Sequence, residues 1–275
     1  MNGLEVLDLF CGAGGFSEGF KQAGFNIIFG IDNDKWSCKT FKWNFPKAEV
    51  ICEDIRNFNN YPKCDVIIGS PPCKEFSKGN IDRTWDTKLV DRFLEIIKQA
   101  EPKFWVMENV PEVIDVINNL TGKYKRIFNV SLILNAYDFG CATTRTRLFA
   151  GNFPKEIKKS KEKKAVKDVI NINRAGYRQP YKDNVYRHIN PNKPFVTLVS
   201  QRICNERYLL PNGTSLEVSE MATIQGFPSN FVFPVSRSEA QKQVGNSVCP
   251  PVAKAIAEQI SLPLKPKGMS IREAT

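Results

Sequence analysis

Short apolar segments alternate with amphipathic segments along the first 150 residues of the chain. Apolar runs that end in turn residues predict strands, and amphipathic patterns predict helices at 16–23 and 88–100. Such alternation is typical of a doubly wound α/β sheet, in which helices connect the strands. The predicted strands are Leu4–Phe10, Asn26–Ile31, Glu49–Cys52, Asp65–Gly69, Phe104–Met107, Ile127–Leu134 and Arg147–Gly151.

After Asn152 the sequence becomes basic and irregular, and helical patterns return from Leu216 and again at 251–260. With 275 residues, the chain can form one large domain with a small companion. We expect a sheet domain that comprises 1–152 and 245–275, and a small irregular lobe at 153–244.

The composition is that of an ordinary globular protein, with 42% hydrophobic and 25% charged residues, which excludes a low-complexity chain. Apolar runs stay below the ~18 residues of a membrane helix, and the first residues lack the basic start of a signal peptide. The eight cysteines form no C-x-x-C pair and match no zinc spacing. We therefore expect a cytoplasmic protein with reduced thiols, no bound metal and no membrane association, and we expect it to be a monomer.

The formal net charge is +10, and residues 155–193 contribute twelve Lys or Arg against four Asp or Glu. A basic patch attracts polyanions, of which nucleic acid is the usual one. The alternative is a solvated linker, which the lysine run alone would favour. Aromatic residues interleaved with arginines favour a binding surface instead. They are Tyr177, Tyr181 and Tyr186, beside Arg174, Arg178 and Arg187.

The first strand leads into a glycine-rich turn, DLFCGAGG at 8–15. Glycines there allow the backbone to approach a ligand at the carboxyl end of the strand. Asp32, at the end of the next strand, is placed to hold the ribose hydroxyls of an adenosine cofactor, and Asp54 would lie near the adenine. Ser17 stands where a dinucleotide fingerprint has its third glycine, a change that S-adenosylmethionine, which has no pyrophosphate, tolerates. The alternative is a purely structural turn.

Three further groups are predicted to meet at the same edge of the sheet. Cys73 lies on a loop stiffened by two prolines after the fourth strand, and Glu108 ends the fifth strand. Arg145 and Arg147 alternate along an extended segment, so their guanidinium groups face one side. The alternatives are a buried structural cysteine and a surface ion pair. Because His188 is the single histidine, a Cys-His or Ser-His-Asp relay is disfavoured.

In combination, these motifs resemble those of the cytosine-5 DNA methyltransferases. Six segments match in family order: 8–15, Gly-Ser-Pro-Pro-Cys at 69–73, Glu-Asn-Val at 108–110, Thr-Arg-Thr-Arg at 144–147, Gln-Gly-Phe-Pro at 225–228 and Gly-Asn-Ser-Val at 245–248. The unmatched stretch, about 154–205, is where family members carry their target-recognition region. The resemblance implies a Rossmann-like α/β methyltransferase sheet with a small, irregular target-recognition lobe. The short chain resembles the prokaryotic, restriction-modification type.

The resemblance also implies the reaction, which is methyl transfer from S-adenosylmethionine to carbon 5 of a cytosine flipped out of double-stranded DNA. Carbon 5 is a poor nucleophile, so the thiolate of Cys73 would first add to carbon 6. Glu108 would hydrogen-bond ring nitrogen 3 and the exocyclic amine. Arg147 would hold the cytosine oxygen, with Arg145 nearby.

Further contacts follow from the resemblance in the same way. The cofactor residues would be Asp8, Phe10, Gly12, Gly14, Gly15, Asp32, Asn33, Asp54, Ile55, Pro71, Asn246, Ser247 and Val248. The DNA-binding residues would be Lys74, Ser77, Lys158, Lys159, Arg174, Arg178, Arg187 and Arg202. A cognate restriction endonuclease acting on the same DNA site would be a further partner.

Three positions depart from the family pattern. Thr143 and Lys74 stand where the family usually has glutamine, and Thr214 stands at an arginine position. The main alternative is a transfer-RNA cytosine-5 methyltransferase of the same fold, although its Cys-Phe-Thr signature after Glu-Asn-Val is absent here. Another alternative is a nucleic-acid binder without catalysis, and a nicotinamide oxidoreductase would explain the first motif alone.

Overall fold

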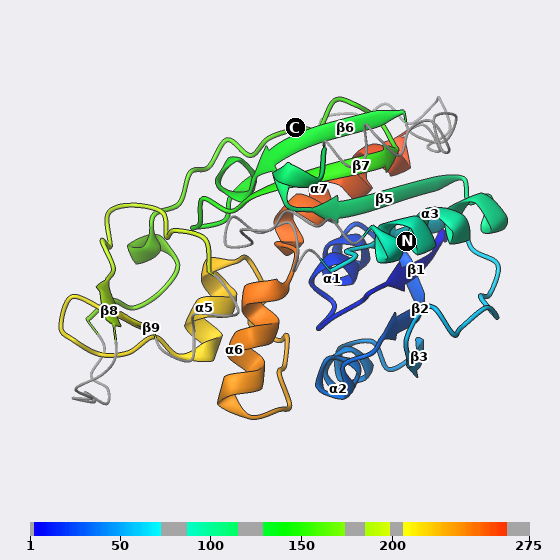
Figure 1. Cartoon of the computed structure of the whole chain (residues 1–275). Helices are drawn as coiled ribbons and strands as arrows, with labels where there is room; N and C mark the ends of the chain where they lie inside the picture. Colours follow the sequence, from blue (N-terminus) through cyan, green and yellow to red (C-terminus); the bar gives the residue numbers. More distant parts are fainter. Residues whose placement is uncertain (1–2, 73–86, 115–128, 174–184, 199–205, 263–275) are drawn as a thin grey trace, which may run out of the picture.

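A seven-stranded sheet in the order β3-β2-β1-β4-β5-β7-β6 forms the centre of the computed structural model (Figure 1), which describes residues 3–72, 87–114, 129–173, 185–198 and 206–262. Strands β1 to β5 run parallel to one another, and β7 is antiparallel to both β5 and β6. The strands are β1 Glu5–Leu9, β2 Asn26–Asp32, β3 Glu49–Cys52, β4 Val66–Gly69, β5 Phe104–Asn109, β6 Val130–Asn135 and β7 Thr146–Asn152.

Helices follow β1, β2 and β4 and connect them to the next strands, so the predicted doubly wound α/β sheet is confirmed. The α-helices are α1 Gly15–Gln22, α2 Lys35–Asn44, α3 Lys88–Ala100, α5 Val218–Ile224, α6 Arg237–Asn246 and α7 Pro250–Ser261. Short 3-10 helices are η1 Pro111–Val113, η2 Ala136–Phe139 and η3 Val166–Asp168. The predicted helix at 88–100 matches α3, whereas α2 and α6 were not predicted.

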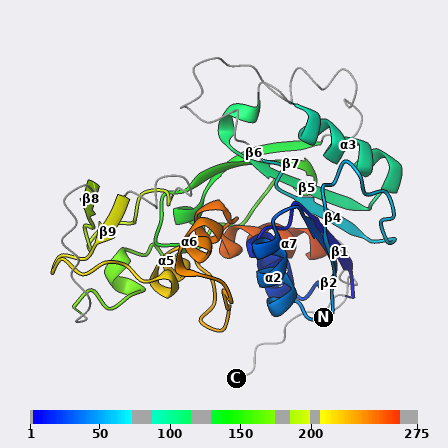
Figure 2. The ribbon, with the colours of Figure 1, turned by 60° about the horizontal axis from the view of Figure 1, so that its bottom comes forward.

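Both faces of the sheet are covered (Figure 2), which explains why its central strands are continuously apolar. On β4, Val66 and Ile68 point into one core together with Phe16 of α1 and Val252 of α7. Ile67 points into the other core, which α3 covers. Side chains alternate between the faces along a strand, so Asp8 of β1 and Glu108 of β5 lie on the α1 and α7 side.

The order of the strands reverses at β1. From β1 the chain runs to β2 and β3 on one side, and it then crosses to β4 and β5 on the other side. In open α/β sheets, ligands bind in the crevice outside the carboxyl ends of the strands at such a switch point. The glycine-rich turn that follows β1 begins at this position.

The described residues between 153 and 246 pack beside the sheet, whereas α7 lies on one of its faces. Strands β8 Val185–His188 and β9 Glu206–Leu209 form a parallel two-stranded ribbon, and α5 and α6 lie between this ribbon and the sheet (Figures 1 and 2). Leu210 and Leu216 share one continuous core cluster with Phe16 of the sheet domain. The division at 152 and 245 stays a prediction.

Candidate active site

The turn between β1 and α1 has the backbone that its glycines allow. Gly12 and Gly14 adopt positive φ values of 53° and 98°, and Phe10 has a φ of 62°. A Cβ atom at Gly12 would meet no atom within 4 Å, so open space lies beside this backbone. A Cβ atom at Gly15 would overlap the carbonyl oxygen of Val248, which shows how closely the segment after α6 approaches the turn.

Asp32 stands at the end of β2 and holds this turn. Its Oδ2 accepts a hydrogen bond from the backbone N–H of Gly12 at 2.9 Å, and its Oδ1 accepts one from the N–H of Asp34 at 2.8 Å. Burial raises the pKa of Asp32, while these backbone donors oppose the shift. A carboxylate offers about four lone-pair sites, so acceptor capacity remains for ribose hydroxyls.

Two other predicted cofactor acids have protein partners. Asp8 is 1% exposed, and its Oδ2 accepts a 2.6 Å hydrogen bond from the hydroxyl of Ser17. Burial raises the pKa of Asp8 to about 7. Asp54 is paired with Arg56, whose hydrogen bonds lower the pKa of Asp54 to about 2. Asp8 therefore lies beneath the turn, and its direct contact with a cofactor stays a prediction, as does that of Asp54.

The segment between α6 and α7 brings the chain back to the glycine-rich turn. The backbone oxygen of Asn246, the last residue of α6, accepts from Arg145, and the Ser247 hydroxyl donates to the carbonyl of Gln243 at 2.7 Å. Val248 then lies against Gly15 and lines a neighbouring pocket. The Gly-Asn-Ser-Val segment and the DLFCGAGG turn are therefore in contact, although more than 200 residues separate them.

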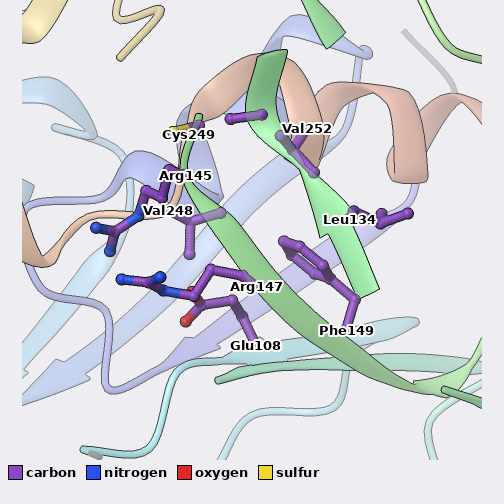
Figure 3. Close-up of a pocket in the computed structure, with 9 residues that line it drawn as sticks. Glu108, Leu134, Arg145, Arg147, Phe149, Val248, Cys249 and Val252 are labelled. Carbon is purple, nitrogen blue, oxygen red and sulfur yellow. The ribbon is translucent and has the colours of Figure 1, made fainter. Parts of the chain in front are cut away.

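The pocket lies on the α1 and α7 face of the sheet (Figure 3). Glu108 and Arg147 face each other in it, with 3.2 Å between the Arg147 Nε and the Glu108 Oε1. Glu108 Oε1 is buried and has no hydrogen-bond partner among the described residues. The lining residues are Glu108, Leu134, Ala136, Arg145, Arg147, Phe149, Val248, Cys249 and Val252.

Arg145 and Arg147 both line the pocket, but their guanidinium groups have different partners. Arg145 is 4% exposed, and it donates to the backbone oxygens of Leu198 at 3.2 Å and Asn246 at 3.4 Å. The structure thus gives Arg145 a positioning role between two distant segments. A contact of Arg145 with the reacting base stays a prediction.

Asn109 is a site residue to which the sequence analysis assigned no role. Its Nδ2 donates to the backbone oxygen of Pro71 at 3.1 Å, and its Oδ1 accepts from the N–H of Val110. Asn109 therefore ties the end of β5 to the loop that precedes Cys73. Cys73 itself lies outside the described residues, as do Lys74 and Ser77.

A model of the C-5 cytosine-specific DNA methylase family matches residues 4–189 and 152–262. The chain belongs to this family. It is a DNA cytosine-5 methyltransferase, as the resemblance implied. The type II methyltransferase M1.HphI of Haemophilus parahaemolyticus is 29% identical over 94% of this chain and 86% of its own length. A Methanocaldococcus jannaschii protein described as type II methyltransferase M.MJ0563P is 31% identical over 94% of this chain and 99% of its own.

The fold of the methyltransferase is shared with solved structures. A protein encoded within an E. coli prophage and described as a DNA modification methyltransferase superposes with a TM-score of 0.76. It is 24% identical in sequence, and the match covers 93% of this chain and 98% of that protein. The similarity therefore extends beyond the sheet to the segments that pack beside it.

The predicted DNA-binding residues of the methyltransferase are only partly described. Lys158 and Lys159 are exposed, but the Lys159 ammonium lies 3.0 Å from the carboxylate of Asp138, which also pairs with Lys163. Lys159 therefore has a protein partner that the sequence did not reveal, and its contact with DNA stays a prediction. Arg174, Arg178 and Arg202 lie outside the described residues, and of Arg187 the backbone alone is described, as part of β8.

Thr143 and Thr214, at two positions that depart from the family pattern, are buried. The Thr143 hydroxyl donates to the backbone oxygen of Val196 at 3.4 Å, next to the short bridge between Thr143 and Phe195. Thr143 thus joins the residues just before β7 to the segment that follows β8.

In the described part of the chain, no helix has the length and apolar character to cross a membrane, and no cluster of three metal-binding side chains occurs.

Proposed function

We propose that the enzyme methylates carbon 5 of a cytosine flipped out of a specific double-stranded DNA sequence, with S-adenosylmethionine as methyl donor and Cys73 as nucleophile. The supporting observation is the buried Glu108 Oε1 without a hydrogen-bond partner in the described structure. The Arg147 Nε lies 3.2 Å from this oxygen as an ion pair without forming a hydrogen bond, so a ligand that donates to Oε1 would satisfy the acceptor. The exocyclic amine of cytosine is such a donor.

Each of the other residues around the pocket has its own role in the proposed reaction. Arg147, beside Glu108, supplies positive charge for the cytosine oxygen. The Cys73 thiolate adds to carbon 6, which makes carbon 5 electron-rich, and it leaves after carbon 5 has lost its proton. Asn109 orients the loop that carries Cys73 through its hydrogen bond to Pro71. A hydrogen bond between Glu108 and ring nitrogen 3 requires one proton: a protonated carboxyl donates to the nitrogen, or a protonated ring nitrogen donates to the carboxylate.

The turn and the returning segment fit S-adenosylmethionine, which supplies the methyl group when bound. The support for this assignment is the open space beside Gly12, where a side chain would project, and the unused acceptor capacity of Asp32. Phe10, Gly12 and Gly14 would form one wall, and Val248 the opposite one. The names of the relatives support a type II restriction-modification role, in which a nuclease acts on the same DNA site.

Trapping of the covalent adduct tests the proposal. Duplex DNA is prepared with 5-fluorocytosine at the target position. The fluorine on carbon 5 cannot leave as the proton does, so the enzyme should stay covalently attached to the DNA. We expect a denaturant-stable complex in which peptide mass analysis locates the DNA on Cys73, and none with Cys73→Ser. Transfer RNA should give no product. Attachment at another residue, or methylation of transfer RNA alone, would contradict the proposal. Bisulfite sequencing of DNA from expressing cells identifies the recognised sequence.

A further inference from the structure

Two buried cysteines meet at the edge of the pocket, and the proposed reaction uses neither. Cys141 is 1% exposed and Cys249 is 3% exposed. The Cys141 Sγ donates to the backbone oxygen of Gln225 at 3.6 Å, and the Cys249 Sγ donates to the Gln225 Oε1 at 3.5 Å. The two thiols also influence each other electrostatically, since each shifts the pKa of the other. Gln225 thus holds both sulfur atoms in one place, although 108 residues separate the cysteines in the chain.

The pocket provides access to this pair. Cys249 is a lining residue of the pocket, where it lies close to Arg145 and Val248 (Figure 3). The pocket is thus the route by which a small oxidant would reach its sulfur atom.

The surroundings of Cys249 also lower the pKa of its thiol, and the thiolate is the reactive form of a cysteine. The neighbouring Cys141 thiol lowers the pKa of Cys249, and the charges of Arg145 and Arg147 act in the same direction, whereas burial and the charge of Glu108 oppose the shift. By contrast, burial raises the pKa of Cys11 and Cys64.

We propose that Cys141 and Cys249 form a modification site, at which a two-electron oxidant such as hydrogen peroxide converts the two thiols into a disulfide. The Cys249 thiolate attacks one peroxide oxygen and breaks the O–O bond, which leaves a sulfenic acid and releases one water after protonation. The Cys141 sulfur then attacks the sulfenic sulfur, so the S–S bond forms and a second water leaves. Two thiols and one peroxide thus give one disulfide and two waters.

The disulfide would alter the segment that joins the pocket to the glycine-rich turn. A disulfide bond measures about 2.05 Å, so the two sulfur atoms must leave Gln225 and move toward each other. Both thiol hydrogen bonds to Gln225 are lost, and the Gln225 amide also donates to the backbone oxygen of Val244 near the end of α6. Cys249 directly follows Val248, which contacts Gly15. Resting here on the proposed function, we expect oxidation to weaken S-adenosylmethionine binding about tenfold.

The first test identifies the bond without any activity measurement. The full chain is prepared as Cys73→Ser, so that the proposed nucleophile does not react, and is treated with hydrogen peroxide. Remaining thiols are alkylated in denaturant, and the digest is analysed by mass. We expect a peptide pair joining Cys141 to Cys249, which dithiothreitol separates. Substitution of the exposed Cys52 by serine should leave the pair intact, whereas Cys249→Ser should remove it. Recovery of both cysteines as separate alkylated peptides would overturn the proposal.

The second test measures S-adenosylmethionine binding by calorimetry with the same oxidised and reduced Cys73→Ser protein. The expected tenfold loss should be reversed by dithiothreitol and should not occur in Cys249→Ser. Equal affinities for the fully cross-linked and the reduced protein would refute the coupling to the cofactor turn. If the reduced protein does not bind S-adenosylmethionine, the proposed function fails instead, and the peptide masses still decide whether the disulfide forms.

Discussion

The substitution Gly12→Ala should weaken cofactor binding through an effect that can be measured apart from its effect on the stability of the fold. Gly12 has a φ of 53°, and a Cβ atom there would have no protein neighbour within 4 Å. Gly12→Ala therefore introduces no clash within the protein, and its cost to folding is the strain of an L-residue in the left-handed region, about 1–2 kcal/mol. For a chain of this size, each kcal/mol lowers Tm by roughly 2–4 °C. The new methyl group projects into the space that we assign to S-adenosylmethionine.

Gly213 offers a matched control. It has a φ of 80°, and a Cβ atom there would likewise meet nothing within 4 Å. It follows β9 in a turn that is distant in sequence from the glycine-rich turn. Gly213→Ala should therefore cost a similar free energy of unfolding, while the space next to Gly12 remains open.

Thermal unfolding with and without S-adenosylmethionine measures the difference. A ligand present at 100 times its Kd stabilises the folded protein by about 2.7 kcal/mol. If the methyl group weakens binding tenfold, which corresponds to about 1.4 kcal/mol, the ligand stabilises the variant by only about 1.4 kcal/mol. We expect the ligand-induced rise in Tm to be about halved in Gly12→Ala and unchanged in Gly213→Ala. A full rise in Gly12→Ala would refute the placement of the cofactor at this turn.

Three further predictions concern the acid beneath the turn, the loop before the nucleophile and the basic segment. Because burial raises the pKa of Asp8 from 3.8 to about 7, the folded protein retains a proton that the unfolded chain releases. The free energy of unfolding should therefore fall as the pH rises between those two values, by at most about 1.4 kcal/mol per pH unit. Asp8→Asn should remove this pH dependence in denaturant titrations. Asn109→Ala, which deletes the bond to Pro71, should slow methylation about tenfold with unchanged S-adenosylmethionine affinity; equal loss of both would indicate misfolding instead. Lys158→Ala should reduce the salt slope of DNA binding by about 1, and Lys159→Ala should change it less; equal slopes for both variants and the natural chain would favour a solvated linker.

The strands of the sheet were predictable because burial on both faces makes them short, continuous apolar runs. Helices α2 and α6 were missed because they lack a clear apolar stripe. On α2, Trp36 and Trp43 are exposed, and Phe41 provides most of the packing. The available signals were the capping residues. Asp34 accepts from the N–H of Trp36, and Ser236 accepts from the N–H of Glu239, in the Ser-x-x-Glu pattern that starts α6.

The residue types of the candidate site followed from the motifs, because Glu108 and the glycine-rich turn lie at the ends of recognisable strands. The partners of these residues did not follow, because many of them are backbone atoms of distant segments. Arg145 illustrates the limit: an arginine in an extended segment predicts a direction, but not that its acceptors are the carbonyls of Leu198 and Asn246. The ion pair between Lys159 and Asp138 could not be predicted either, because a run of lysines predicts positive charge but not its partners.

Arg145 also explains how the pocket can depend on segments that contribute no chemistry. Its guanidinium is a planar group with donors at fixed angles, so the two carbonyls that it binds are held in a defined relation to each other. Leu198 lies beside the segment that pairs with Thr143, and Asn246 ends α6 just before the residues that contact the glycine-rich turn. Two residues after Arg145, the same chain carries Arg147 to Glu108. A displacement of the segment around Leu198 would therefore strain the support of the glycine-rich turn and of the Glu108 pocket together, which would link the proposed recognition lobe to the proposed site of methyl transfer.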